Sequence, residues 1–494
     1  MKIKGNVMNN KKTGVGHSAL HLTIAKIITI FISLLSSMLL SRFRTVEEYG
    51  TYSQLTIAIT LATSLFMLGL PNSINYFLAK ADNAEERRDF LSVYYSLNTI
   101  LGVILGLVLV LLVPLIEAYF DNAAISAFWY FLAIYPWAHV TISSIGNVLV
   151  VYDRTKLLMI INVITTSVAL LSVVVIQVLG LSFKEYITAF LIGNIAIALW
   201  IYSMIFRLEK GIGVHINGTL IRKIFSYSIP IGLASLVGTI NIEMDKLMIG
   251  RMLGTEALAY YTNAGKELPL TIIASSLTAV LMPQIVRKLK KGDKEGVVSL
   301  WGVSIELSYI IICFFVTACV VFAPQIITIL YSEKYLPGVN IFRIYSLVLL
   351  LRTTYFGLVL NSMGKTKFIL YSSAGSLLIN IILNCLMYWA IGFEGPALAS
   401  FASIFVVGFA QLWWTSSALS VSLRKLFPWS KLLKISTINI IWGVIASIII
   451  FLLNIKTDMC SLVISVALGC VFTGGYLLIL GKKIKYAWGV LNND

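Results

Sequence analysis

The sequence contains unusually few charged residues. Asp, Glu, Lys and Arg make up 12% of its 494 residues, about half the share in soluble globular proteins, whereas 58% are hydrophobic. The mean hydropathy is +0.89. Cysteine is also scarce: the five cysteines form no Cys-x-x-Cys pair, so we expect no disulfide framework, no metal and no cofactor. The composition excludes a soluble globule and indicates a membrane protein.

No polar segment is long enough to form a separate soluble domain. Fourteen apolar stretches, each near the roughly 20 residues that cross a bilayer as a helix, occupy most of the chain. A β-barrel would instead show about ten residues of alternating apolarity per strand. We therefore predict an all-α polytopic membrane protein with spans near 19–40, 51–79, 91–113, 125–151, 157–179, 186–206, 224–249, 256–286, 297–322, 339–362, 368–390, 396–419, 434–453 and 460–480.

A cleavable leader is not expected either. The first 18 residues are too polar for a signal peptide, and no small-residue cleavage pattern follows the first apolar stretch. Of the 38 lysines and arginines, 27 lie in alternate loops and seven in the opposite ones. This positive-inside bias predicts that both termini are cytoplasmic.

The net charge of +16 does not indicate a nucleic-acid partner. A nucleic-acid-binding protein gathers its cations on one soluble patch, whereas these cations alternate with the apolar spans. We expect them to contact anionic membrane lipids instead.

An internal repeat divides the chain. At an offset of 209 residues, the segment 41–47 lies over 250–256, and each copy is followed by similar landmarks. The repeat predicts two parallel six-helix lobes, between which transporters commonly bind their substrate. The predicted parts are a cytoplasmic segment 1–18, an N-lobe 19–206, a cytoplasmic connector 207–223, a C-lobe 224–419, and residues 420–494 with two further spans and a cytoplasmic end.

Polar stripes at helical period occur on the first, second, seventh and eighth spans. Such stripes either line a water-filled cavity or pack helices together, and their matched positions in the two halves favour a cavity. The predicted cavity-lining residues are Ser33, Ser37, Thr60, Ser235, Thr239, Asn263 and Glu267.

Four cations fall inside the apolar spans: Lys26, Lys266, Arg343 and Arg352. Each costs about 2.5–3.5 kcal/mol at mid-membrane, so each is a functional candidate. Arg343 and Arg352 are nine residues apart and can face one cavity only if their helix is irregular. Alternatively, one of them pairs with the buried Glu306, and Lys26 extends back to the membrane surface.

The excess of interior cations predicts an anionic cargo, because Arg can hold a phosphate with two parallel hydrogen bonds and Lys acts as a point charge. Asp245 and Lys246, near the outer end of the seventh span, are interpreted as an interfacial pair.

Several motifs resemble one superfamily. The run Asp245-Lys246-x-x-Ile249-Gly250, followed by Tyr260-Tyr261, resembles the polysaccharide-exporter branch of the multidrug/oligosaccharidyl-lipid/polysaccharide (MOP) superfamily, which includes the O-antigen and capsule repeat-unit flippases. Glu267-Leu268-Pro269, followed by Pro283, is similar to the eighth span of the related lipid II flippases. The run Gly392-x-x-Gly395-x-Ala397-x-Ala399 is similar to a recurrent Gly/Ala pattern of the family.

The resemblance implies a two-lobed, non-enzymatic transporter of the bacterial cytoplasmic membrane. Such a protein flips polyprenyl-diphosphate-linked oligosaccharides by alternating access, and its cavity cations contact the diphosphate. Its expected partners are the lipid-linked oligosaccharide, membrane lipids, a polysaccharide polymerase and a chain-length regulator. Coupling to Na⁺, H⁺ or the membrane potential stays open. The alternatives are a cation-coupled multidrug exporter, a lipid II flippase, a membrane glycosyltransferase or polymerase, and a scaffold.

Overall fold

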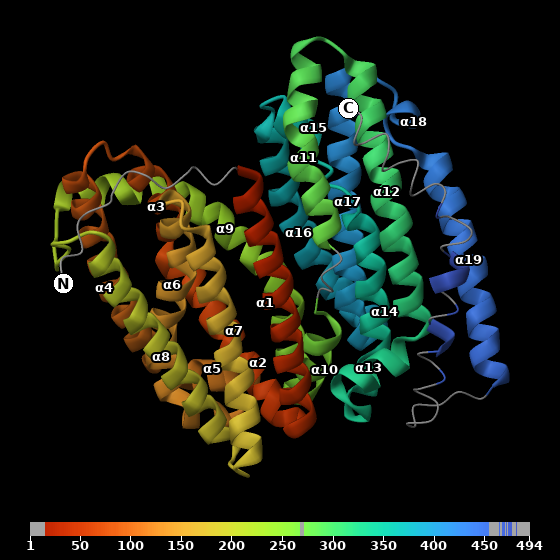
Figure 1. The fold of residues 1–494 in the computed structure, drawn as a ribbon. Helices are drawn as coiled ribbons and strands as arrows, with labels where there is room; N and C mark the ends of the chain where they lie inside the picture. The colour runs from red at the N-terminus through yellow and green to blue at the C-terminus, as the bar shows by residue number, and fades with distance from the viewer. Residues whose placement is uncertain are drawn as a thin grey trace. The chain divides into compact units, whose positions relative to one another are not determined.

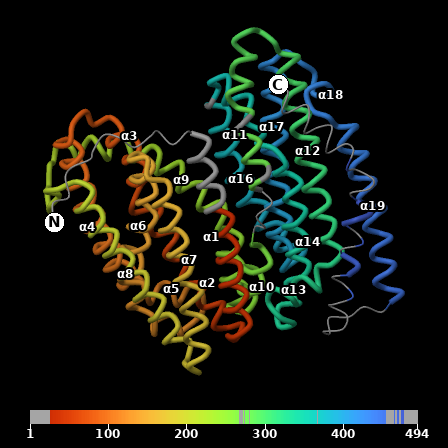
Figure 2. Tube along the Cα trace, viewed as in Figure 1, coloured from red at the N-terminus to blue at the C-terminus, as the bar shows by residue number. Residues whose placement is uncertain are grey.

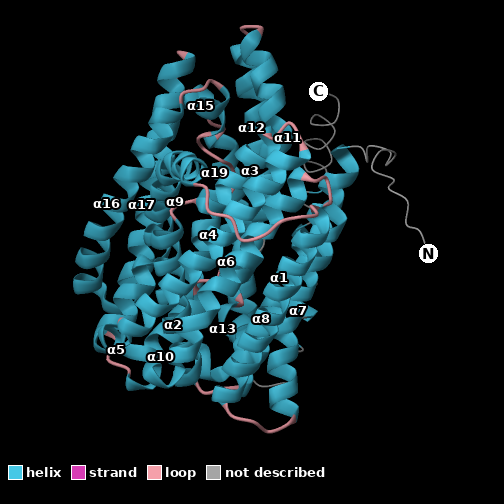
Figure 3. Ribbon diagram, turned by 90° about the vertical axis from the view of Figure 1, so that its left-hand side faces the viewer, coloured by secondary structure: helices cyan, strands magenta, loops and turns pink. Residues whose placement is uncertain are grey.

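The computed structural model describes residues 15–266 and 271–453, together with 464, 467–469, 471, 473–476 and 481. Within these residues every regular element is helical (Figure 3). The elements are α1 (Val15–Phe43), α2 (Val46–Met67), α3 (Leu70–Lys80), α4 (Ala84–Leu111), α5 (Val113–Phe120), η1 (Ala123–Phe128), α6 (Trp129–Val151), α7 (Thr155–Val178), α8 (Phe183–Leu208), α9 (Gly218–Met252), α10 (Gly254–Ala264), α11 (Thr271–Lys290), α12 (Lys294–Val321), α13 (Ala323–Tyr331), η2 (Glu333–Gly338), α14 (Val339–Val348), η3 (Leu349–Arg352), α15 (Leu358–Ser362), α16 (Thr366–Ile391), η4 (Gly392–Glu394), α17 (Gly395–Leu419), α18 (Leu423–Leu426) and α19 (Trp429–Leu452).

The all-α membrane fold is confirmed, but the count of fourteen spans is not. Ten helical segments of the described chain are long and apolar enough to cross a membrane, and eleven if the bent pair α2 and α3 forms one span. One of the ten, Lys367–Leu419, contains both α16 and α17. The predicted span 256–286 is divided between α10 and α11. Most of the predicted span 460–480 lies outside the described residues.

The chain forms two compact units, Met1–Thr239 and Ile240–Asp494, and the division falls inside α9. We call them the N-terminal and C-terminal units. They run from red to yellow-green and from green to blue along the trace (Figure 2). The lobe and connector boundaries expected from the repeat remain a prediction.

The N-terminal unit is built from neighbouring antiparallel and crossing helices. Helix α1 packs along α7, α4 along α6, and α6 against α3 and α8 (Figure 1). Its core consists of buried Leu, Ile, Val and aromatic side chains from α3, α4, α6, α7, α8 and the start of α9. These apolar faces meet because a helix that is apolar all round can bury one side in protein and expose the other to lipid.

A bend of 45° separates α2 from α3. Two residues in the left-handed region form it, Leu68 at φ 38° and Gly69 at φ 74°, before Pro71 in the first turn of α3. At Gly69 the backbone lies against α9, where a Cβ on Gly232 would come within 2.0 Å of the Leu68 carbonyl carbon. Only glycine permits this approach, so α3 and α9 are fixed to each other at this point.

The C-terminal unit packs α16 along α17, α12 along α19, and α14 against both α12 and α17. The predicted tenth span is not one regular helix: α14 ends at Val348, η3 continues to Arg352, and α15 begins only at Leu358. Arg343 thus lies on α14, and Arg352 lies in the 3₁₀ turn that follows it. The three cysteines among the described residues are free thiols: Cys313, Cys319 and Cys385.

Candidate functional site

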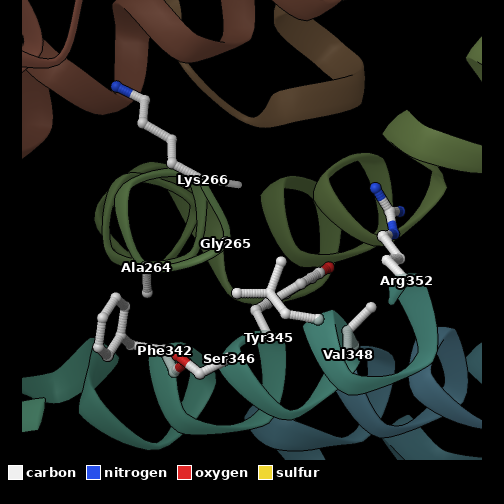
Figure 4. A pocket seen from close by; sticks show the side chains of 9 residues that line it. Ala264, Gly265, Lys266, Phe342, Tyr345, Ser346, Val348 and Arg352 are labelled. Atoms are coloured by element: carbon white, nitrogen blue, oxygen red, sulfur yellow. The ribbon is translucent and has the colours of Figure 1, made fainter. Parts of the chain in front are cut away.

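A small recess of the C-terminal unit brings together two of the predicted cations. Lys266 follows the end of α10, and Arg352 ends η3. Both line one pocket of about 20 Å³ with residues of α10 and α14. In Figure 4 the Lys266 ammonium lies at the upper left and the Arg352 guanidinium at the right, and both point away from Phe342 and Ser346.

The recess in this conformation has room for about one water molecule. Its apolar wall contains Phe342, Val348 and Leu349 (Figure 4). Two cations beside an apolar wall form a site that favours an anion, because a low dielectric strengthens charge interactions. A diphosphate would fit only after the recess widens.

Irregular backbone explains why these two cations share a site. Gly265 and Lys266 lie beyond the last turn of α10 rather than in a continuous span. Arg352 stands at the end of the 3₁₀ turn that follows α14. Non-helical backbone at membrane depth is tolerated where it is buried in protein or lines a water-filled cavity, which fits a binding site.

Arg343 is not among the residues that line this recess. Its Nε donates to the Val320 carbonyl at 3.2 Å, and its Nη1 donates to the Asn340 side-chain oxygen at 3.2 Å. Its guanidinium thus joins α14 to α12. The expectation that one arginine pairs with Glu306 is wrong for the described contacts, because Glu306 forms a 2.7 Å ion pair with Lys431 of α19.

A second polar cluster lies around Asp245, whose side chain is 2% exposed. Four neutral groups donate to its carboxylate: the Asn384 amide at 2.9 Å, and the hydroxyls of Ser400 at 2.5 Å, Tyr345 at 2.7 Å and Tyr261 at 3.3 Å. They come from α10, α14, α16 and α17, so one carboxylate connects five helices.

The predicted interfacial pair between Asp245 and Lys246 is not formed. Lys246 instead pairs with Glu243 at 2.9 Å, one turn earlier on α9. Adjacent residues on a helix point in directions about 100° apart. Asp245 can therefore face the neighbouring helices while Lys246 pairs with Glu243 along α9.

The Asp245 cluster has the chemistry of a small-cation or proton site. A buried carboxylate is stable only when its charge is compensated, and the four groups that reach it in the structure are neutral. The side-chain oxygen of Asn384 is buried beside it and accepts no hydrogen bond from any described group. A carboxylate next to an unsatisfied amide oxygen can bind a small hard cation or a proton.

The sequence contains two signals of this cluster, but they do not show that its residues lie together. Asp245 interrupts an apolar span, and Asn380 and Asn384 follow at i, i+4 spacing on another span. Only the packing of α9 on α16 and α17 shows that these signals belong together.

The predicted polar residues of the N-terminal unit do not gather at one point. On α1, Lys26 and Ser33 are exposed, and the Ser37 hydroxyl lies 3.2 Å from the Tyr49 hydroxyl. The hydroxyl of Thr60 donates to the carbonyl one turn earlier, at 2.7 Å. Hydroxyls bonded to their own helix backbone are a common way to accommodate Ser and Thr in a membrane helix.

Two of the polar stripes do meet. Ser64 of α2 donates to the Thr239 hydroxyl of α9 at 3.1 Å, and Ser235 lies exposed one turn earlier. In the C-terminal unit, Asn263 is buried at 1% exposure in α10. Glu267 lies outside the described residues.

Comparison with known proteins identifies a family over part of the chain and a shared fold over most of it. Residues 39–340 match the sequence profile of a family described as polysaccharide biosynthesis protein. No curated protein sequence matches the chain.

Solved structures share its fold. The lipid II flippase MurJ in an inward closed conformation aligns with a TM-score of 0.76 at 17% identity, covering 94% of this chain and 100% of that one. An inward-facing multidrug resistance MATE transporter of the MOP superfamily gives 0.63 at 15%, covering 83% and 99%. A MOP superfamily transporter from Pyrococcus furiosus, whose binding pocket has reverse polarity, gives 0.51 at 14%, covering 83% and 99%. The chain is a multi-pass membrane protein with the fold of these MOP-superfamily structures, as the sequence predicted.

Proposed function

The chain belongs to the polysaccharide biosynthesis protein family, and we propose that it flips a polyprenyl-diphosphate-linked oligosaccharide across the bacterial cytoplasmic membrane. The repeat unit would serve a surface polysaccharide such as O-antigen, capsule or exopolysaccharide. Both termini would lie in the cytoplasm, as the loop charges predict. The family and the fold support a flippase, and the interior cations support an anionic cargo.

The observation that carries this proposal is the shared recess of Lys266 and Arg352. A diphosphate offers oxygens to both a forked guanidinium and an ammonium group, and each such hydrogen bond is worth about 1.5–3 kcal/mol. In this mechanism the recess widens, holds the charged head group, and leaves the prenyl tail in lipid.

The Asp245 cluster could couple the binding of a cation or proton to the movement of the head group. A cation or proton bound to Asp245 would change the charge at a point where α9, α10, α14, α16 and α17 meet. Binding there favours one arrangement of these helices over another only if the cation binds the two arrangements with different affinity. We propose that this difference links cation entry to movement of the head group.

The test is genetic complementation. In a strain that lacks the native protein, K266A and R352A should each reduce surface polysaccharide strongly while the protein remains in the membrane at normal level. K434A, which removes an exposed lysine on α19, serves as the control and should complement. Full complementation by both K266A and R352A would refute their role as head-group ligands.

The buried carboxylate also favours a second candidate, a cation-coupled multidrug exporter. Cationic drugs would be repelled by a recess that contains Lys266 and Arg352, so this candidate requires another binding surface. A panel of antimicrobial susceptibilities with and without the gene separates the two: a flippase leaves the panel unchanged and a drug exporter does not.

A further inference from the structure

A second, larger recess lies on the N-terminal unit, between the C-terminal end of α3 and the first turns of α9. Both helices are labelled in Figure 1. Its volume of about 680 Å³ is within the range of small-molecule sites. Its lining includes Tyr76, Lys80, Thr219, Arg222, Lys223 and Tyr227. We call it the α3/α9 recess, and the loop charges predict that it faces the cytoplasm.

The α3/α9 recess is strongly basic. Its three cations, Lys80, Arg222 and Lys223, are accompanied by no Asp or Glu in the lining. The ion pairs among the described residues do not include these three cations. The amino end of α9 adds partial positive charge, because the helix begins at Gly218 and Thr219 lines the recess.

An aromatic pair stands beside these cations. The rings of Tyr76 and Tyr227 stack with centroids 4.6 Å apart and an angle of 19° between their planes. Tyr76 is 42% exposed, and the Lys80 ammonium lies 5.6 Å from its ring centroid. A partly exposed aromatic pair offers apolar ring carbons and polar hydroxyl ends, against which the C–H face of a sugar ring can pack.

The two sides of the α3/α9 recess are held in place by the core beneath them. Ile74 of α3 and Ile224 of α9 are both completely buried in the same apolar cluster. The close contact of Gly69 with Gly232 fixes the two helices further along. The two helices that carry these side chains are therefore held at a fixed separation before any ligand binds, which reduces the entropy cost of binding.

We propose that the α3/α9 recess binds a glycosyl phosphate, with the phosphate against Lys80, Arg222 and Lys223 and the first sugar on Tyr76 and Tyr227. This inference rests on the proposed function, because a lipid-linked oligosaccharide carries such a group on the cytoplasmic side. The recess would then be a first docking point for cargo. Phosphate chemistry is shared with phospholipid head groups, but the exposed aromatic pair favours the sugar.

The test measures binding separately from transport. Full-length protein is placed in phosphatidylcholine nanodiscs, and N-acetylglucosamine 1-phosphate is the probe, because it has no lipid tail. Saturation-transfer NMR reports contact of the sugar protons with the protein. All variants are made in a K266Q/R352Q background, so that the recess of the C-terminal unit does not contribute.

The triple variant K80Q/R222Q/K223Q should bind the probe roughly tenfold more weakly or worse, since each exposed charge contact contributes about two- to fivefold. Added salt should weaken binding to the parent protein and have little effect on the triple variant. Y76L should lose the saturation transfer to the sugar protons, whereas Y76F should keep it. The matched control R424Q/K425Q/K434Q removes three other exposed cations and should bind like the parent.

Two results would overturn the inference. One is equal affinity for the triple variant, the control and the parent. The other is absence of saturable probe binding in phosphatidylcholine while the parent protein, but not the triple variant, enriches phosphatidylglycerol from mixed nanodiscs, since that identifies a phospholipid site. Flipping of lipid-linked oligosaccharide by the wild type is measured in parallel. If the wild type flips the lipid but the triple variant binds the probe as well as the parent does, the α3/α9 recess is refuted as a binding site and the proposed function is not.

Discussion

Replacing Asp245 by Asn tests whether this buried carboxylate serves coupling or only folding. The change keeps the size of the side chain and removes its charge. The carboxylate is 2% exposed and accepts four hydrogen bonds from neutral donors. Asn has only one acceptor oxygen. The three hydroxyl bonds on Oδ2 would change from charge-assisted bonds of about 1.5–3 kcal/mol to neutral ones of about 0.5–1.5 kcal/mol, whereas the Asn384 amide on the other oxygen would face an NH₂ group and lose its acceptor.

The loss amounts to about 1 kcal/mol for each of the three hydroxyl bonds and about 2 kcal/mol for the lost amide bond, or about 5 kcal/mol in all. Against it stands the desolvation cost of a buried carboxylate, which is also several kcal/mol and is absent in Asn. The two terms offset, so we expect the free energy of unfolding to change by less than about 2 kcal/mol. A purely structural role therefore predicts a variant that folds and works.

The assay is thermal unfolding of purified protein with Na⁺, with K⁺ and across pH, followed by transport in proteoliposomes with imposed cation gradients. A cation that binds only the folded protein stabilises it by about 2.7 kcal/mol at one hundred times its Kd. The wild type should show this stabilisation and gradient-dependent flipping, and D245N should show neither. Normal gradient-dependent flipping by D245N would refute the coupling role.

Two further predictions concern packing. G232A should destabilise the N-terminal unit by more than about 2 kcal/mol, because its Cβ would meet the Leu68 backbone at 2.0 Å; the control G238A has nothing within 4 Å, and equal melting temperatures for both would contradict the close approach. R343K should lose the hydrogen bond to the Val320 carbonyl and lower stability by about 1 kcal/mol. Transport by R343K should remain near normal, and a severe transport defect at unchanged stability would instead place Arg343 in cargo binding.

The membrane class and most helix positions could be predicted from the sequence, because long apolar runs reflect the length of a bilayer. The positions at which helices break within a predicted span could not be predicted. The predicted tenth span turns out as α14, η3 and α15, and apolar side chains on both sides of a break give no periodicity signal of where the helix stops.

The hydrogen-bond and ion-pair partners of buried polar groups could not be predicted from the hydrophobic pattern either. Asp245 bonds to Asn384 and Ser400, which are 139 and 155 residues away. Glu306 pairs with Lys431, 125 residues away, rather than with an arginine of the tenth span. Hydrophobic periodicity predicts which face of a helix is polar, but it does not tell which helices are neighbours. Lys266 and Arg352 were predicted as interior cations from the cost of charge in a membrane alone, and their common recess could be found only from the packing.

Binding of the cargo diphosphate by Lys266 and Arg352 can be measured through transport. The quantity is the initial rate at which reconstituted protein flips a labelled lipid-linked oligosaccharide in proteoliposomes. Two lost contacts of about 1.5 kcal/mol or more each predict that K266Q/R352Q is at least about a hundredfold slower than the wild type, with normal melting behaviour. A double variant that flips the lipid at the wild-type rate would contradict the account.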